Sequence, residues 1–215
     1  MEWIDIILDL VKAAFFSPEF WSSIADVAIA IATVTTAVSA AWGVSAWKDQ
    51  LVGKTEFDQS QRLLTATIKL RKEIERFRSP FHYPSEFPDS YNSLKATGSQ
   101  KAEAYDYMYR NRWKPVASAY GVFEVEMISA EALWDEVTTQ PCDELCVLVR
   151  KLQVHTSSFI NNCESNDEDF RADPTFAVSV RSVLYGSSDD PFNKKIEAAI
   201  NQLKLVIKPH LSRRL

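Results

Sequence analysis

The chain has 215 residues, a net charge of −5, 46% apolar residues and three cysteines. An acidic balance gives the whole chain no general attraction to nucleic acid, and this apolar share excludes a protein with many membrane spans. Only five glycines and nine prolines are present, which favours an all-α fold over a turn-rich β architecture.

Residues 1–17 are expected to form an amphipathic helix that lies in a membrane interface. The charged side chains of this segment gather on one narrow side of a helical projection: Glu2, Asp5, Asp9 and Lys12. Apolar residues surround the rest, as in interfacial helices, although the polar face of such helices is usually basic. Ser17 is then expected to cap a second helix that starts at Pro18.

Residues 18–47 are expected to form a transmembrane helix. The 21 residues from 27 to 47 contain no charge, and ~20 helical residues cross the ~30 Å hydrocarbon core of a bilayer. Trp21 precedes the uncharged run and Trp47 closes it, where membrane proteins place their interfacial aromatics. The alternative is a buried helix of a soluble protein, because six Val and Ile residues supply only about −2 to −4 kcal/mol of insertion free energy.

Two faces of this helix differ in the size of their side chains. One face carries bulky apolar residues at three- and four-residue steps: Ile24, Val27, Ile31, Val34, Val38 and Trp42. The other carries an acid and four small residues: Asp26, Ala30, Thr33, Ala37 and Ala40. Small residues let helices approach closely in a bilayer, so this face is predicted to be an oligomer interface or a pore lining with Asp26 at its mouth. The alternative is an anchor without a packing partner.

The remainder of the chain is expected to be helical and cytoplasmic. Residues 1–26 carry five acids and one Lys, whereas residues 48–78 carry eight Lys and Arg against five acids. The positive-inside rule therefore places the N-terminus outside. Residues 48–79 are expected to form a helical stalk, because they contain an apolar seam at four- and three-residue steps: Leu63, Thr67, Leu70, Ile74 and Phe77.

Residues 80–98, which contain three prolines, are expected to be a loop, and residues 99–215 a helical bundle. Expected helices of the bundle are 99–113, a stretch from Pro115 to about Val137, 143–163, 174–185, and a last helix from Pro191 to about Pro209 with Asp190 as its cap. The segment ESNDEDFRADP is expected to be an acidic loop.

The three cysteines, Cys142, Cys146 and Cys163, lack the paired spacing of a metal site or a redox motif. They are expected to be buried thiols of a reducing compartment. No cofactor and no metal are expected, because the sequence contains no phosphate-binding loop and no metal-ligand motif.

One short pattern could carry chemistry, the segment RKLQVH that runs from Arg150 to His155. Arginine can hold a phosphate with two N–H groups, and histidine is a general acid and base near neutral pH. An Arg and a His separated by four residues, with the His near a helix end, resemble the signature of HEPN helical bundles, which implies that Arg150 and His155 are candidate catalytic residues of a ribonuclease. A structural Arg and a helix-end His are the alternative. This spacing of an Arg and a His is a loose pattern, because Arg76 and His82 also match it, with five residues between them.

A membrane helix feeding a long cytoplasmic helix, the segment LRKEIERFRSPF and a helical domain bearing RKLQVH together resemble the small HEPN-like membrane accessory proteins of type VI-B CRISPR systems. The resemblance implies a HEPN-like C-terminal bundle and a ring-shaped homo-oligomeric pore in the bacterial inner membrane. Such a pore would strengthen antiviral defence by depolarising the cell, without enzymatic activity.

The same resemblance implies the lipid bilayer, further copies of the chain, and an RNA-guided nuclease complex or RNA as partners. Lys151 stands where active HEPN ribonucleases usually carry Asn, Asp or His, which implies a vestigial or structural Arg150 and His155. A membrane-tethered HEPN ribonuclease and a non-catalytic membrane adaptor are the alternative functions.

Overall fold

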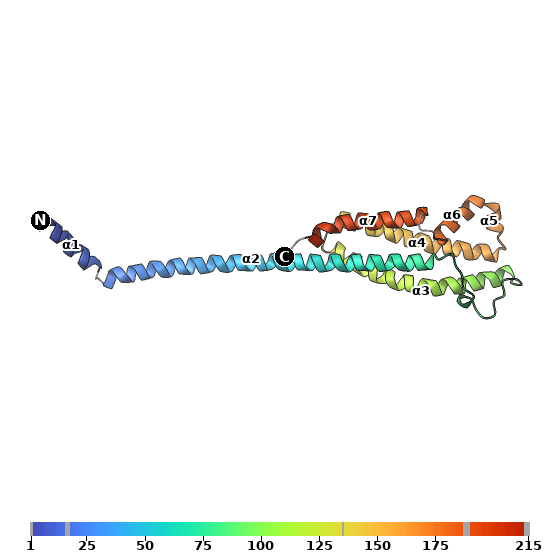
Figure 1. The fold of residues 1–215 in the computed structure, drawn as a ribbon, viewed down its shortest axis with the longest axis horizontal. Coiled ribbons are helices and arrows are strands. Elements are labelled where there is room, and N and C mark those ends of the chain that lie inside the picture. Colours follow the sequence, from blue (N-terminus) through green and yellow to red (C-terminus); the bar gives the residue numbers. More distant parts are fainter. Residues whose placement is uncertain (1, 16–17, 135, 187–189, 213–215) are drawn as a thin grey trace. The chain divides into compact units, whose positions relative to one another are not determined.

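The computed structural model describes residues 2–15, 18–134, 136–186 and 190–212. Within these ranges it contains seven α-helices, one short 3-10 helix and no strand (Figure 1). The all-helical prediction is therefore confirmed. The chain divides into two compact units, Met1–Val52 and Gly53–Leu215.

The first unit holds α1 (Glu2–Phe15) and the beginning of α2 (Pro18–Phe77) (Figure 1). The indole Nε1 of Trp21 donates a hydrogen bond to the carbonyl oxygen of Phe15 at 2.9 Å. The ring of Phe15 also lies 5.3 Å from the ring of Phe20 and 6.1 Å from that of Trp21. These contacts tie the end of α1 to the start of α2. The predicted cap at Ser17 lies outside the described residues.

The second unit begins with the remainder of α2, whose apolar seam is the face that packs into the bundle. Its five residues are each only 1% exposed: Leu63, Thr67, Leu70, Ile74 and Phe77. The bundle core therefore already includes the second half of the predicted stalk, well before residue 99. The helix ends three residues ahead of Pro80, since a proline disfavours helical backbone in the residue before it.

The bundle is centred on α4 (Glu136–Glu164), which packs against α3 (Gly98–Glu131), α6 (Pro174–Leu184) and α7 (Pro191–Ser212) (Figure 1). The largest of the side chains that these helices bury almost completely are Met108, Phe123, Leu145, Leu152, Leu184, Ile200 and Leu203. The start and end of α6 match the prediction closely. Asp190 caps α7 as predicted, accepting hydrogen bonds from the backbone N–H groups of Phe192 and Asn193.

Two prolines are placed differently from the prediction. Pro115 does not interrupt the helix but lies inside α3, because the neighbouring Val116 and the more distant Phe123 are both fully buried and their packing outweighs the ~3 kcal/mol that an interior proline costs. Pro141 likewise lies inside α4. The predicted helix up to residue 137 is wrong, since α3 ends at Glu131 and a turn follows that no glycine or proline marks in the sequence.

Two segments predicted as loops contain short helices. The loop after α2 includes the 3-10 helix η1 (Pro84–Glu86). The acidic segment includes α5 (Glu168–Ala172), whose Phe170 is buried. Asn162 organises this segment, because its side chain donates to Asp167 at 2.7 Å and accepts from the backbone N–H of Phe170 at 2.9 Å.

Candidate membrane span and Arg/His pair

Within the described part of the chain, one helix is long and apolar enough to cross a membrane, and it lies between Phe20 and Phe77. None of its most apolar window is buried. Large apolar side chains on it are exposed, such as Val34, which is 63% exposed, and Trp42, which is 75% exposed. A continuous apolar surface of this kind marks contact with lipid or with another protein.

The two tryptophans that flank the span are separated by a distance that matches a bilayer. At 1.5 Å of rise per residue, Trp21 and Trp47 lie ~39 Å apart along the helix axis. A bilayer with its headgroup layers is ~40–45 Å thick, so both indoles would fall in the headgroup layers if this helix crosses a membrane. In that placement Thr33 and Val34 would lie at the midplane, and Asp26 would lie near one edge of the hydrocarbon core.

The hydroxyl groups of the span are hydrogen-bonded within the helix. Thr33 donates to the carbonyl oxygen of Ile29, Thr35 to that of Ile31, and Thr36 to that of Ala32, each at 2.8 Å. No donor of these three side chains is left unpaired, which lowers the penalty of placing them in hydrocarbon. The high threonine content is therefore compatible with insertion.

The predicted small-residue face lies on one side of α2. At 100° per residue, its five members fall within an arc of about 80°, and all are exposed: Asp26, Ala30, Thr33, Ala37 and Ala40. The bulky stripe occupies a separate arc of similar width. The span therefore has one face suited to close helix contact and another suited to lipid.

Arg150 and His155 lie in α4, but they do not share a face. Five residues of helix rotate the two side chains by about 140°. Arg150 is exposed, whereas His155 is half-buried and its Nδ1 lies 2.9 Å from the carbonyl oxygen of Lys151. Burial lowers the pKa of His155, and the charge of Lys151 acts in the same direction. The expected position near a helix end differs from the structure, since α4 continues to Glu164.

The second loose match also separates its two residues. Arg76 is exposed and pairs with Glu73 on its own helix at 2.6 Å. His82 is packed among aromatic rings, with the centroids of Tyr105 and Tyr185 at 5.8 and 5.9 Å, and its Nε2 is buried without a hydrogen-bond partner. Burial, with the nearby charge of Arg112, lowers the pKa of His82.

Acidification is expected to destabilise the bundle through His82. The pKa of this imidazole is 6.5 in an ordinary setting and lower in the folded protein, so the unfolded chain binds the proton more readily. The free energy of unfolding should therefore fall as the pH drops from ~6.5 toward the folded-state pKa. Urea titrations at several pH values should show a shallower fall for His82→Phe. A pH dependence identical to that of the wild type would contradict this role. The pKa of His155 is also lowered, so this imidazole acts with the same sign.

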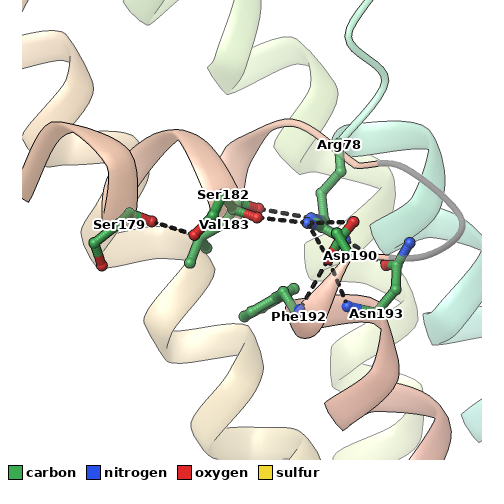
Figure 2. A network of polar contacts seen from close by, with 7 residues as sticks. All are labelled: Arg78, Ser179, Ser182, Val183, Asp190, Phe192 and Asn193. Carbon is green, nitrogen blue, oxygen red and sulfur yellow. Dashed lines mark hydrogen bonds and ion pairs between the residues drawn. The ribbon is translucent and has the colours of Figure 1, made fainter. Parts of the chain in front are cut away.

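A polar network of the second unit centres on Arg78, directly after α2 (Figure 2). Its guanidinium donates to the carbonyl oxygens of Val183 at 2.6 Å and Ser182 at 2.9 Å, both at the end of α6. It also pairs with Asp190 at 3.1 Å and donates to the side chain of Asn193. Figure 2 shows these groups converging on one side chain that is only 1% exposed.

A second arginine holds the end of α2 from the other side. Arg112 of α3 donates to the carbonyl oxygens of Phe77 at 3.2 Å and Ser79 at 2.9 Å, and to both carboxylate oxygens of Glu86 at 2.8 and 2.7 Å. The hydrogen bonds from Arg112 to this carboxylate lower the pKa of Glu86. Neither arginine stands out in the sequence, because their side-chain partners lie between 26 and 115 residues away.

Two of the three cysteines are buried in the bundle interior, as predicted. Cys142 and Cys163 are buried, Cys146 is half-buried, and all three are free thiols. Burial raises the pKa of Cys142 to about 12 and that of Cys163 to about 11, so both are unreactive thiols at neutral pH. Among the described residues, no group of three or more His, Cys, Asp or Glu side chains is arranged to hold a metal ion.

The chain was compared with protein-family models, with curated proteins and with solved structures. None of the three comparisons finds a match. The functional assignment therefore rests on the span, its two faces and the resemblance drawn from the sequence.

Proposed function

We propose that the chain is a single-pass membrane protein that assembles with copies of itself into a pore through the small-residue face of its apolar helix. The pore lies in the bacterial inner membrane, with the N-terminus outside and a HEPN-like bundle in the cytoplasm. Opening it depolarises the cell. The resemblance to type VI-B CRISPR accessory proteins supplies the antiviral role, beside an RNA-guided nuclease, and the protein itself is no enzyme.

The observation that carries this proposal is the contrast between two parts of α2. Apolar side chains from Phe20 to Trp47 are exposed, whereas the apolar seam from Leu63 to Phe77 is buried by the bundle. A soluble protein would not leave such a surface in water. A bilayer covers the bulky stripe, and a neighbouring helix covers the small residues, because van der Waals packing between close backbones drives helix association in lipid.

The chemistry of the small-residue face also suits a pore. Asp26 lies near the outer edge of the hydrocarbon core, so a ring of copies would place a ring of carboxylates at the outer mouth and attract cations. Thr33, near the midplane, retains acceptor lone pairs on its hydroxyl oxygen after donating to Ile29. Alanines on the remainder of the face leave room for water between helices.

The assembly is tested by enlarging one alanine on the small face and one on the opposite side of the same helix. Light scattering in a mild detergent, with the detergent contribution subtracted, should give a discrete multi-subunit mass for the wild type. Ala30→Leu should reduce that mass, because the added side chain separates the backbones. Ala28→Leu, rotated by about 160° from Ala30, should leave it unchanged.

The outcomes separate the proposed pore from its alternatives. A monomeric wild type, or equal effects of the two leucines, would contradict assembly through this face and leave a tethered adaptor.

If the wild type is a multimer, Asp26→Asn should reduce cation flux across the membranes of vesicles that contain the protein. Arg150→Ala with His155→Ala should leave flux intact, since neither residue lies on α2.

A further inference from the structure

The loop between α2 and α3 is fixed at both ends. At its start, the buried side chain of Arg78 is held by hydrogen bonds to the end of α6 (Figure 2). At its far end Thr97 caps α3. Gly98 then lies against the turn after α4, because a Cβ atom added to Gly98 would come within 2.5 Å of the Asn166 side chain. Residues 79–96 therefore form a strap between two anchored points.

The strap itself is weakly embedded in the bundle. None of its residues is buried, and Phe81 and Leu94 are 70% and 93% exposed. Its attachment depends on a few half-buried side chains: Ser79, His82, Glu86, Phe87, Pro88, Tyr91 and Ala96. A segment with so few buried contacts can open at a small cost in free energy while the rest of the fold persists.

His82 attaches the strap to an aromatic surface of the bundle. Four rings surround its imidazole, with centroids 5.8 to 6.4 Å away: Phe87 of the strap, Tyr105 and Tyr109 of α3, and Tyr185 after α6. Its Nε2 is buried without a hydrogen-bond partner. A neutral imidazole can keep this nitrogen unprotonated, whereas an imidazolium places an N–H donor there that the closed strap leaves unpaired.

The charged and titratable groups around the imidazole do not offset a positive charge on it. Arg112 of α3 is a cation, and Glu86 of the strap already binds that cation through both carboxylate oxygens. Burial raises the pKa of Tyr105 to about 12 and also raises those of Tyr109 and Tyr185, so the three phenols are neutral. Burial and the charge of Arg112 lower the pKa of the imidazole, against a smaller opposite effect of Glu86.

We propose that protonation of His82 releases the strap from the bundle while the helices remain folded. Release places the imidazolium in water, which supplies the hydrogen bonds and the dielectric that its aromatic surroundings lack. The anchored ends keep the strap beside its site, so it closes again when the proton leaves. This device goes beyond the proposed pore and does not depend on it, because all its residues lie in the unit Gly53–Leu215.

Hydrogen exchange of the full chain in mild detergent, with each rate divided by the intrinsic rate at the same pH, measures the opening of the strap. The reporting amides are those of Glu86, Phe87 and Tyr91, which donate within the strap in turns too short to persist alone. From about pH 7.5 to about pH 5.5 the ratio of open to closed strap should rise, by up to about tenfold, because the released imidazole binds the proton more readily. An unchanged ratio would overturn the proposal. So would a falling ratio, which would mean that the rings stabilise the imidazolium.

Low concentrations of urea separate release of the strap from unfolding of the whole bundle. Local opening exposes little new surface, so exchange of the strap amides at the lower pH should hardly respond to urea. Exchange in the buried part of α4 should respond steeply, because it requires global unfolding. A parallel response of the two regions would show that the strap opens only with the bundle, and would overturn the proposal.

Two histidine variants provide the matched comparison. His82→Phe keeps an aromatic ring among the four others and removes the titration, so the rise in strap opening at low pH should disappear. His155→Phe removes a half-buried histidine of α4 whose pKa is also lowered by burial, yet this residue lies outside the strap. The rise should persist in His155→Phe. Loss of the rise in both variants, or its persistence in both, would overturn the assignment to His82.

Discussion

Replacing Arg78 with alanine is expected to lower the free energy of unfolding of the bundle by about 3–5 kcal/mol. The side chain is only 1% exposed, and its partner Asp190 is 11% exposed. The substitution would leave a buried carboxylate without its ion pair and the carbonyl oxygens of Ser182 and Val183 without their donor. Unsatisfied buried groups of this kind carry their full desolvation penalty.

The position of Arg78 explains why the effect should be this large. Its backbone carbonyl oxygen accepts from Gly186 at 2.9 Å, and its guanidinium lies 4.6 Å from the centroid of the Phe192 ring. One residue therefore connects the end of α2 to the end of α6 and the start of α7. Losing it should loosen all three helix ends together, so the transition should also become less cooperative.

Chemical unfolding followed by circular dichroism in detergent measures this prediction. Arg76→Ala is the matched control, because it removes an arginine two residues away that is 75% exposed and pairs only along its own helix. Its effect should stay within about 0.5 kcal/mol. Arg78→Lys should fall between the two, since an ammonium cannot reproduce the planar fork of donors. Equal stabilities of Arg78→Ala and Arg76→Ala would contradict the role of the network.

The helices were predictable where local periodicity and packing agree. The seam from Leu63 to Phe77 repeats every three or four residues, and the structure buries that side of α2. The cap at Asp190 follows from the preference of aspartate ahead of a helix that begins with proline. The signal for the start of α3 was also present, because Thr97 and Gln100 form a capping box.

Features that depend on distant residues could not be read from the sequence. Arg78 looks like any arginine near a helix end, and its partners Val183 and Asp190 are more than a hundred residues away. Pro115 looks like a break, and only the packing of α3 keeps it in the helix. Arg150 and His155 have the right spacing for a motif. Five residues of helix nevertheless place their side chains about 140° apart around the helix axis.

The two halves of α2 differ in the exposure of their apolar side chains. In its second half the apolar side is buried in the shared core of the bundle. In its first half the large apolar side chains from Phe20 to Trp47 are exposed, as the proposed membrane span requires. An acid placed at the midplane of the span therefore probes its surroundings directly.

Val34→Asp is expected to abolish stable insertion of the span. A carboxylate at the centre of a transmembrane helix costs about 2.5–3.5 kcal/mol, which is close to the whole insertion free energy that the Val and Ile residues supply. Val34 belongs to the bulky stripe, where the proposed assembly faces lipid. The equilibrium ratio of inserted to non-inserted span, measured by glycosylation or thiol-labelling of engineered sites on both sides, should fall roughly a hundredfold.

Thr33→Asp places the same charge at the same depth but on the small-residue face. If that face lines a water-filled pore, the carboxylate is hydrated and the loss of insertion should be much smaller than for Val34→Asp. If the helix is a solitary anchor, both positions face lipid and the two variants should insert equally poorly. Because the residues are adjacent, differences in depth or flanking sequence cannot produce a gap between them. The ratio of the two inserted fractions therefore distinguishes a pore from a tether.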